Sequence, residues 1–368
     1  MKLNNKLLAQ MRAATRNLMH RSPVDTSKII EDALNNASAL TQAAQQQMRG
    51  MSPPAGGQGQ PVDMHEMLAN LGRGFGSGGA ANEPAQALPG TFSGGSFANA
   101  AGSRDYKLYV PSTYAGQPAG QPVPLVVMLH GCTQDPDDFA KGTQMNVLAE
   151  ETGCLVVYPA QSRQANASRC WNWFNNVDQQ RDQGEPSIIA GITRKIMDEY
   201  AIDQTQVYVA GLSAGGAMAT IMGTLYPDLY AAVGVHSGLP FASAHDLPSA
   251  LAAMKGDFKR QHIPGKPIPI IVFHGDQDKT VHPVNGDELV APARDKAEAM
   301  AVEPGRVPNG HAYTRTTHKR ADGRVHAEHW LIHGAGHAWS GGSAHGSYTD
   351  GRGPDASREM MRFFRTQK

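Results

Sequence analysis

The residues best suited to chemistry lie in the sequence GLSAGG at positions 211–216, where Ser213 has a glycine two positions away on either side. In a Gly-x-Ser-x-Gly turn between a strand and a helix, the serine backbone is strained and only small neighbours fit beside it. The turn lifts the hydroxyl clear of the sheet, at the start of the helix. We therefore predict that Ser213 is a nucleophile.

Both flanks of this turn agree with that prediction. The apolar run at 207–210 predicts a strand, and apolar residues at helical spacing follow between Ala217 and Leu225. Tyr226 then precedes a proline, which ends the helix. This strand, turn and helix distinguish the motif from a chance occurrence in a chain with 40 glycines.

A serine hydroxyl becomes a good nucleophile when a histidine takes its proton and a carboxylate orients that histidine. In a fold of this kind the acid follows the serine along the chain, at the end of a later strand. The apolar run at 268–273 leads into Asp276 and Asp278, and the two compete for this role. We favour Asp278, which lies further into the loop, because a carboxylate directly after a strand, such as Asp276, often holds a turn instead.

The histidine is expected last along the chain. The predicted strand at 327–332 is followed by His333 and His337. We predict that His337, in the loop, is the base, and that His333, at the strand end, packs against the sheet. Three other histidines are expected to be hydrogen-bonded residues at strand ends, namely His130, His236 and His274.

Two backbone N–H groups are needed to hold the oxyanion that forms during acyl transfer. Ala214, the residue after the nucleophile, is expected to supply one. The other is expected from the sequence HGCTQ at 130–134, where Gly131 permits close approach. Cys132 or Thr133 presents the N–H in that loop, and we favour Cys132.

Three aromatic residues fall within four positions after Cys170, in a loop-like stretch. Such clusters are more often part of a core, but this one follows a predicted strand at the edge of the sheet where a substrate would lie. We therefore predict Trp171 and Trp173 as substrate-contacting residues. We also include Trp339, which lies two residues after the predicted base, and His130 in that set.

Short apolar strands alternate with helices from about residue 104 onward. This alternation predicts the α/β-hydrolase fold, with a mostly parallel central sheet and helices on both faces. The predicted strands cover residues 106–110, 124–129, 155–158, 206–210, 231–235, 268–273 and 327–332. The predicted helices cover residues 139–152, 187–200, 214–225, 249–258, 286–301 and 357–364.

The N-terminal part of the chain differs in composition from this catalytic domain, which we place at 104–368. Residues 1–50 have a loosely helical pattern and predict a short helical segment. Residues 51–103 are rich in glycine, proline and small polar residues, which bury little apolar surface, so we predict a disordered linker. Residues 1–21 lack the continuous apolar segment of a secretory signal, which favours a cytoplasmic over an extracellular location.

Overall composition limits the classes of partner. The 368-residue chain has a formal net charge of zero and no cluster of lysine and arginine, which argues against nucleic acid. No apolar run approaches the roughly 18 residues of a membrane span. The three cysteines lack the spacing of a metal site, and the predicted chemistry requires no metal or organic cofactor.

These motifs together resemble the poly(3-hydroxybutyrate) depolymerase family of esterases, which is related to feruloyl and acetylxylan esterases. The resemblance covers about residues 104–368. It rests on LHGCTQ at 129–134, CWNW at 170–173, GLSAGGAM at 211–218, HGDQD at 274–278 and GHAWSGG at 336–342. It implies a triad of Ser213, Asp278 and His337, and it implies that Cys132 can pair with Cys170.

The resemblance implies a serine esterase that cleaves polyester, oligoester or small ester substrates through an acyl-enzyme. A feruloyl or acetylxylan carboxylesterase is the alternative with the same machinery. A non-catalytic granule-binding protein is the alternative of another class, and an intact serine, acid and histidine in the expected order argue against it. The N-terminal segment could still bring an active enzyme to a polymer granule. Without a recognisable secretory signal or a polymer-binding domain after the last helix, soluble oligomers or intracellular polymer rank equally with solid extracellular polymer.

Overall fold

The computed structural model describes residues 87–116, 120–259 and 267–367. The predicted helical segment at 1–50 and most of the predicted linker lie outside these residues. Within the described part of the chain, no helix is both long enough and apolar enough to cross a membrane.

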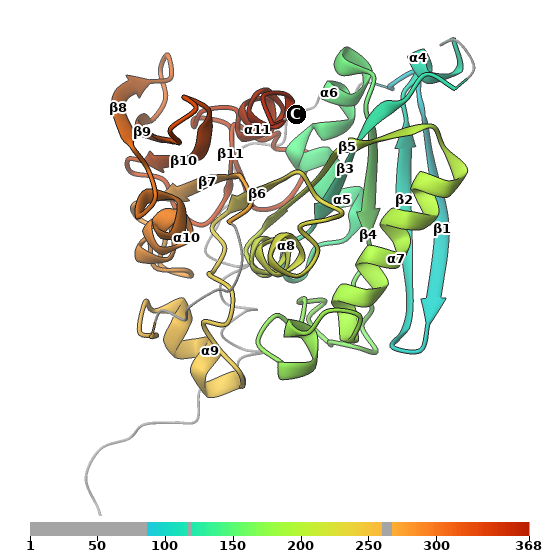
Figure 1. Ribbon diagram of the computed structural model, residues 1–368, viewed down its shortest axis with the longest axis horizontal. Helices are drawn as coiled ribbons and strands as arrows, with labels where there is room; N and C mark the ends of the chain where they lie inside the picture. Colours follow the sequence, from blue (N-terminus) through green and yellow to red (C-terminus); the bar gives the residue numbers. More distant parts are fainter. Residues whose placement is uncertain (1–86, 117–119, 260–266, 368) are drawn as a thin grey trace, which may run out of the picture. The chain divides into compact units, whose positions relative to one another are not determined.

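A ten-stranded sheet forms the centre of the described domain (Figure 1). Its strands are β1 (Thr91–Asn99), β2 (Gly102–Val110), β3 (Val123–Leu129), β4 (Leu155–Pro159), β5 (Ile202–Leu212), β6 (Ala232–His236), β7 (Ile270–Gly275), β8 (Ala299–Arg306), β9 (Ala312–Lys319) and β10 (Val325–Ile332). Their order is β1-β2-β4-β3-β5-β6-β7-β10-β9-β8. The strands from β4 to β10 in this order are parallel, whereas the pairs at both edges are antiparallel.

Helices cover both faces of this sheet. They are α4 (Ser112–Ala115), α5 (Pro136–Thr143), α6 (Met145–Thr152), α7 (Gly184–Glu199), α8 (Ala214–Leu225), α9 (Leu247–Met254), α10 (Val284–Arg294) and α11 (Ala356–Arg365). On β3, Leu125 and Val127 belong to the core on one face, which includes residues of α7, α8 and α10. Val126 and Met128 belong to the core on the other face, which includes residues of α5, α6 and α11. Both faces of the central strands are therefore buried, which explains their continuous apolar sequences. The predicted fold class is confirmed.

The edges of the sheet differ from the prediction. Residues 91–99 form β1, inside the stretch predicted as a disordered linker, so that boundary was wrong. The Phe92 ring packs against Tyr158, at 5.7 Å between ring centroids. Phe97 lies directly against Gly191 of α7, since a Cβ at that glycine would come 2.2 Å from its ring. Two aromatic anchors thus order a strand whose composition is otherwise typical of a linker.

Two predicted helices also end differently. The helix predicted at 139–152 is broken at Gln144, whose φ of 55° is left-handed, and becomes α5 and α6. The helix predicted at 286–301 stops at Arg294, and the chain enters the β8–β9 hairpin, which the prediction lacked. β9 pairs with β10 along its length, so long-range pairing rather than local preference decides this edge.

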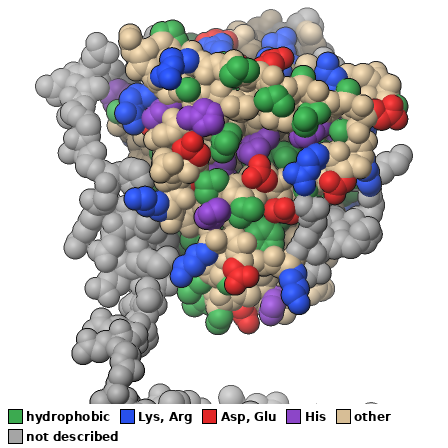
Figure 2. Space-filling view, turned by 90° about the vertical axis from the view of Figure 1, so that its left-hand side faces the viewer, with side chains coloured by type: hydrophobic (Ala, Val, Ile, Leu, Met, Phe, Trp, Pro, Cys, Tyr) green, Lys and Arg blue, Asp and Glu red, His purple; other side chains and the backbone are tan. Residues whose placement is uncertain are grey.

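The face of the molecule shown in Figure 2 carries acidic and basic side chains interspersed, together with several histidines. No large patch of one charge is visible among the described residues on this side.

Candidate active site

Ser213 occupies a strained turn between β5 and α8. Its φ of 57° and ψ of −119° lie outside the regions that side-chain-bearing residues prefer. A Cβ on Gly211 would come 2.3 Å from the carbonyl oxygen of Gly215, and a Cβ on Gly215 would come 2.1 Å from that of Leu129. Both positions therefore require glycine, and the turn has the geometry of a nucleophile elbow.

His337 and Asp278 form a buried pair. His337 Nδ1 lies 2.7 Å from Asp278 Oδ2, and the backbone N–H groups of Thr280 and Val281 donate to Oδ1 at 2.9 Å each. Burial by itself raises the pKa of Asp278, but the charge and hydrogen bond of His337 and the Val281 N–H outweigh it, so this pKa lies well below its usual range. An ionised Asp278 holds the proton of His337 on Nδ1 and leaves Nε2 as a base.

The backbone around Ser213 is connected to the loop of His337 through His236. The Ser213 N–H donates to the His236 carbonyl at 2.9 Å. The Nε2 atom of His236 accepts a hydrogen bond from the Ser340 N–H at 3.0 Å, three residues after His337. The ends of β5 and β6 and the loop after β10 therefore meet at the carboxyl edge of the parallel strands, where the elbow lies.

The two residues that were not favoured in the prediction pair with each other. Asp276 Oδ2 lies 3.0 Å from His333 Nδ1, and Asp276 Oδ1 accepts from the Gly334 N–H at 2.8 Å. Asp276 therefore braces the loops after β7 and β10, which agrees with the structural role predicted for it. His333 Nε2 lies 2.9 Å from Thr314 Oγ1 of β9, but the side chain is 41% exposed, so it is only partly packed against the sheet.

The loop after β3 leaves one backbone N–H without an acceptor among the described residues. The Gly131 N–H donates to the Gln134 side chain at 2.9 Å, and the Thr133 N–H donates to the Ser168 carbonyl at 2.7 Å. For the Cys132 N–H, the described residues offer no such acceptor. This difference supports Cys132 over Thr133 as the second oxyanion donor, which stays a prediction.

An apolar pocket adjoins the nucleophile. Counted together with the open solvent at its mouth, its space is about 540 Å³. Its lining comes from the loops after β3, β4, β5, β6 and β7, from the start of α8 and from α9. It consists of Cys132, Cys170, Trp173, Phe174, Ser213, Ala214, Leu239, Ala250, Leu251, Met254, Thr280 and Val281. Cys132 and Cys170 are joined by a disulfide, with 4.2 Å between their Cα atoms, which is the pairing that the resemblance implied.

Comparison with known proteins identifies the family. The family model described as "Esterase PHB depolymerase" matches residues 104–295. This chain belongs to the esterase PHB depolymerase family. The "Poly(3-hydroxyalkanoate) depolymerase C" of Paucimonas lemoignei is 33% identical over 235 residues, which are 60% of this chain and 56% of that protein. The "Poly(3-hydroxybutyrate) depolymerase" of Ralstonia pickettii is 28% identical over 64% of this chain and 51% of its own length.

This member of the esterase PHB depolymerase family thus spans about half the length of the two depolymerases. "Feruloyl esterase B" of Thermothelomyces thermophilus is 28% identical over 50% of this chain and 67% of that protein. Among solved structures, an acetyl xylan esterase from Aspergillus awamori superposes with a TM-score of 0.56 at 21% identity, covering 72% of this chain and 94% of that one. This last likeness concerns the fold, which is that of the α/β-hydrolases.

Of the predicted substrate-contacting residues in this chain, Trp173 lines the pocket. Trp171, Trp339 and His130 do not, since each is at most 1% exposed. The Trp339 indole donates to the Ser357 hydroxyl at 3.1 Å and stacks on His236. These three predictions were wrong because the side chains pack in the layer beneath the site. Sequence reasoning missed α9 as a wall of the pocket, although it predicted a helix at 249–258.

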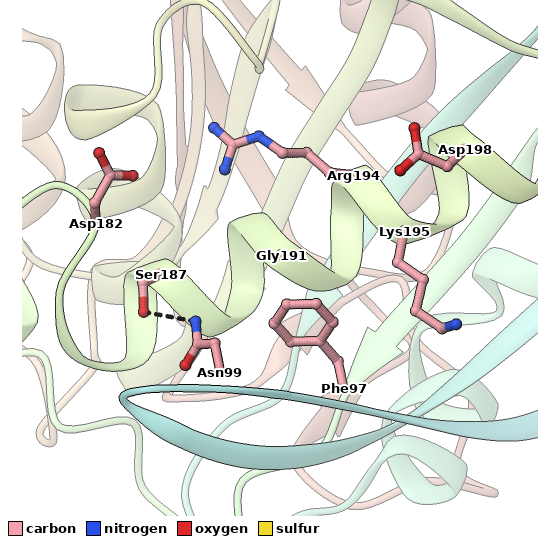
Figure 3. Close-up of a pocket in the computed structure, with 8 residues that line it drawn as sticks. All are labelled: Phe97, Asn99, Asp182, Ser187, Gly191, Arg194, Lys195 and Asp198. Atoms are coloured by element: carbon pink, nitrogen blue, oxygen red, sulfur yellow. Dashed lines mark hydrogen bonds between the residues drawn. The ribbon is translucent and has the colours of Figure 1, made fainter.

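A second hollow lies between β1 and α7 (Figure 3) and shares no lining residue with the pocket beside Ser213. Asn99 bridges to Ser187 across it, with 3.1 Å between the amide nitrogen and the hydroxyl oxygen. The Ser187 hydroxyl itself donates to the Gly184 carbonyl at 2.8 Å, and Lys195 pairs with Glu199 at 2.6 Å. None of the described residues that line this hollow is a histidine, which a serine nucleophile needs, so this hollow is not the candidate site of the family's chemistry.

Buried histidines beneath the site should make the stability of this protein depend on pH. His130 and His236 are buried and hydrogen-bonded, as predicted. Burial lowers the pKa of His130 to about 4 and that of His236 to about 3. In the unfolded chain a histidine has a pKa of about 6.5, so the unfolded state binds more protons below that pH. The stability these groups contribute is complete above about pH 6.5 and is lost as the pH falls toward 4.

We expect the free energy of unfolding to fall by about 2 kcal/mol for each of these two histidines between pH 7 and pH 5. Urea unfolding at both pH values measures this loss. In the variant His130→Gln, whose amide can still accept from Gln161, the loss should be smaller by about 2 kcal/mol. Equal losses in the wild type and the variant would contradict the assignment.

Proposed function

We propose that this chain is a serine esterase that hydrolyses the ester bonds of poly(3-hydroxybutyrate)-type polyesters or their oligomers through an acyl-enzyme. The observation that carries the proposal is the strained Ser213 turn, together with the buried Asp278–His337 pair at the same edge of the sheet. The names of the two depolymerases among its relatives support the substrate class.

In the proposed reaction, Nε2 of His337 takes the proton of Ser213 as its hydroxyl oxygen attacks the ester carbonyl. The N–H groups of Ala214 and Cys132 hold the oxyanion, and the alcohol leaves with the proton from Nε2. Water then repeats these steps on the acyl-enzyme and regenerates the serine. Asp278 stays ionised throughout, which its low pKa favours.

The apolar pocket beside Ser213 is suited to the alkyl part of an ester. Leu251 of α9 lines this pocket, whereas its neighbour Ala252 does not. Replacing Leu251 with phenylalanine should narrow the pocket and lower kcat/KM for a p-nitrophenyl hexanoate ester about 10-fold, because larger substrates lose their fit. The acetate ester should be affected by less than about 2-fold.

The variant Ala252→Phe is the matched control, since it adds the same side chain to the same helix outside the pocket. Its kcat/KM values for both esters should stay near those of the wild type. An equal loss for acetate and hexanoate in Leu251→Phe would contradict this assignment of the pocket.

Hydrolysis of 3-hydroxybutyrate dimers and trimers by the purified full chain tests the proposed function. We expect kcat/KM for these oligomers to exceed that for methyl ferulate at least 10-fold. The opposite ranking would favour the feruloyl or acetylxylan esterase alternative. That alternative is supported by the extent of the match: the match covers 67% of the feruloyl esterase but only 56% and 51% of the two depolymerases.

The granule contact predicted for the N-terminal segment falls on residues outside those the structure describes. A polyester or oligoester partner is supported by the relatives alone.

A further inference from the structure

A buried ion pair lies beside the site without taking part in the proposed reaction. The Glu185 carboxylate, in the first turn of α7, lies 3.0 Å from the guanidinium of Arg104 on β2. Their side chains are 5% and 8% exposed. Breaking such a pair leaves a buried charge, but the pair itself often adds little stability compared with apolar residues. Its other contacts therefore indicate what it does.

The remaining contacts of the Glu185 carboxylate lead to one loop segment, Cys170–Trp173, either directly or through Gln161. Glu185 Oε2 accepts from the backbone N–H of Asn172 at 2.8 Å, and Oε1 accepts from the Asn172 side chain at 2.9 Å. Gln161 donates from one amide group both to Glu185 and to the Cys170 carbonyl, the latter at 2.9 Å. The carboxylate thus holds Asn172 directly and reaches Cys170 through Gln161.

The same segment carries two parts of the candidate site. Trp173 forms a wall of the pocket beside Ser213. Cys170 is joined by the disulfide to Cys132, the residue whose N–H is proposed to hold the oxyanion. A displacement of Cys170–Trp173 would therefore move the pocket wall and the oxyanion donor together.

A second connection reaches the Cys132 loop at its first residue, His130. The backbone N–H of Gln161 donates to His130 Nε2 at 3.1 Å, and His130 Nδ1 lies 2.8 Å from the Gly131 carbonyl. The side chain of Gln161 also accepts from Arg104 Nε at 2.8 Å. The Cys132 loop is therefore attached at His130, and through the disulfide at Cys132, to one buried polar network that includes Glu185.

We propose that Glu185 is a positioning residue, which fixes the Cys170–Trp173 segment and, through the disulfide, the oxyanion N–H of Cys132. This inference rests on the proposed function. Glu185 does not touch the substrate in this role. It acts by holding the Cys132 N–H and the Trp173 side chain in the positions that suit the transition state. A displaced oxyanion donor loses much of its effect on the rate.

The variant Glu185→Gln tests this inference in the full chain. The glutamine amide keeps the shape of the side chain, but its N–H group faces Arg104, Gln161 or Asn172, which are themselves donors. We expect kcat for p-nitrophenyl acetate to fall about 10-fold to 100-fold, somewhat less than the loss of a whole oxyanion donor, with KM within about 3-fold of the wild type. Assays are run well below the melting temperature of each variant.

Glu328→Gln is the matched control. Glu328 is also a buried carboxylate paired with an arginine, Arg362, and it accepts from the Trp330 indole, on the opposite side of the sheet. Its kcat should stay within about 2-fold of the wild type, even where its melting temperature falls. Wild-type kcat in folded Glu185→Gln, or equal losses in both variants, would overturn the inference.

Removing the disulfide separates positioning from general stability. If Glu185 acts through the disulfide, its effect depends on the disulfide. Adding Glu185→Gln to the variant Cys132→Ser/Cys170→Ser should then lower kcat by a smaller factor than Glu185→Gln does in the wild type. Fully multiplicative losses would overturn this route. Should Glu185→Gln fail to fold, Asn172→Ala replaces it, because it removes the side-chain bond and keeps the backbone bond to Glu185. A several-fold fall in kcat is then expected, and an unchanged kcat would overturn the inference.

Hydrogen exchange distinguishes failure of this inference from failure of the proposed function. A wild-type chain without esterase activity would contradict the function. Amide exchange at residues 130–134 then still reports on the loop: faster exchange in Glu185→Gln than in Glu328→Gln supports positioning by Glu185, and equal exchange overturns it.

Discussion

Replacing Ser213 with alanine is expected to lower turnover of a short acyl ester by about four to six orders of magnitude, the scale on which triad nucleophiles act. The strained turn presents a single hydroxyl at the start of α8, and alanine removes it without a change in the backbone. Initial rates with p-nitrophenyl acetate measure the loss. Retention of more than about 1% of the activity would exclude Ser213 as the nucleophile.

Ser187→Ala is the matched control for this experiment, because Ser187 lines the second hollow and donates to a backbone carbonyl. Its turnover should stay within about 2-fold of the wild type. Labelling with a fluorophosphonate gives an independent measure, since it should modify the wild type and Ser187→Ala but not Ser213→Ala.

Replacing Asp278 with asparagine is expected to lower kcat about 10⁴-fold. The carboxylate now accepts from His337 at 2.7 Å and from two backbone N–H groups. In an asparagine at this position, the two backbone N–H groups hold the amide oxygen, so the NH2 group faces His337. The ring then favours the tautomer with Nδ1 unprotonated, and Nε2 is no longer a base. Measurement of kcat with a soluble ester checks this expectation.

Asp276→Asn is the matched control in the same loop. Asp276 pairs with His333 and the Gly334 N–H, so its loss should loosen the contact between two loops and lower kcat by about 10-fold or less. A larger effect at Asp276 than at Asp278 would show that the acid had been assigned to the wrong carboxylate.

The sequence by itself determined the parts of this protein that depend on short-range rules. Gly211 is required by a contact with Gly215 in the same turn, and the continuous apolar runs of the central strands follow from burial on both faces. The order of serine, acid and histidine follows from the parallel topology, because strand ends meet at one edge. The family and the fold could therefore be predicted before any contact was known.

Only the tertiary structure decided features that depend on long-range packing. Trp171 and Trp173 are two residues apart in one loop, yet Trp171 is fully buried and Trp173 lines the pocket, a difference set by neighbours from other elements. The β8–β9 hairpin exists because β9 pairs with β10, and α9 lies over the pocket because its apolar side is buried there. The contacts of Glu185 with Arg104 and Asn172 likewise join positions far apart in the chain. Pairing, burial and buried charge are properties of the folded chain as a whole, and local sequence patterns do not contain them.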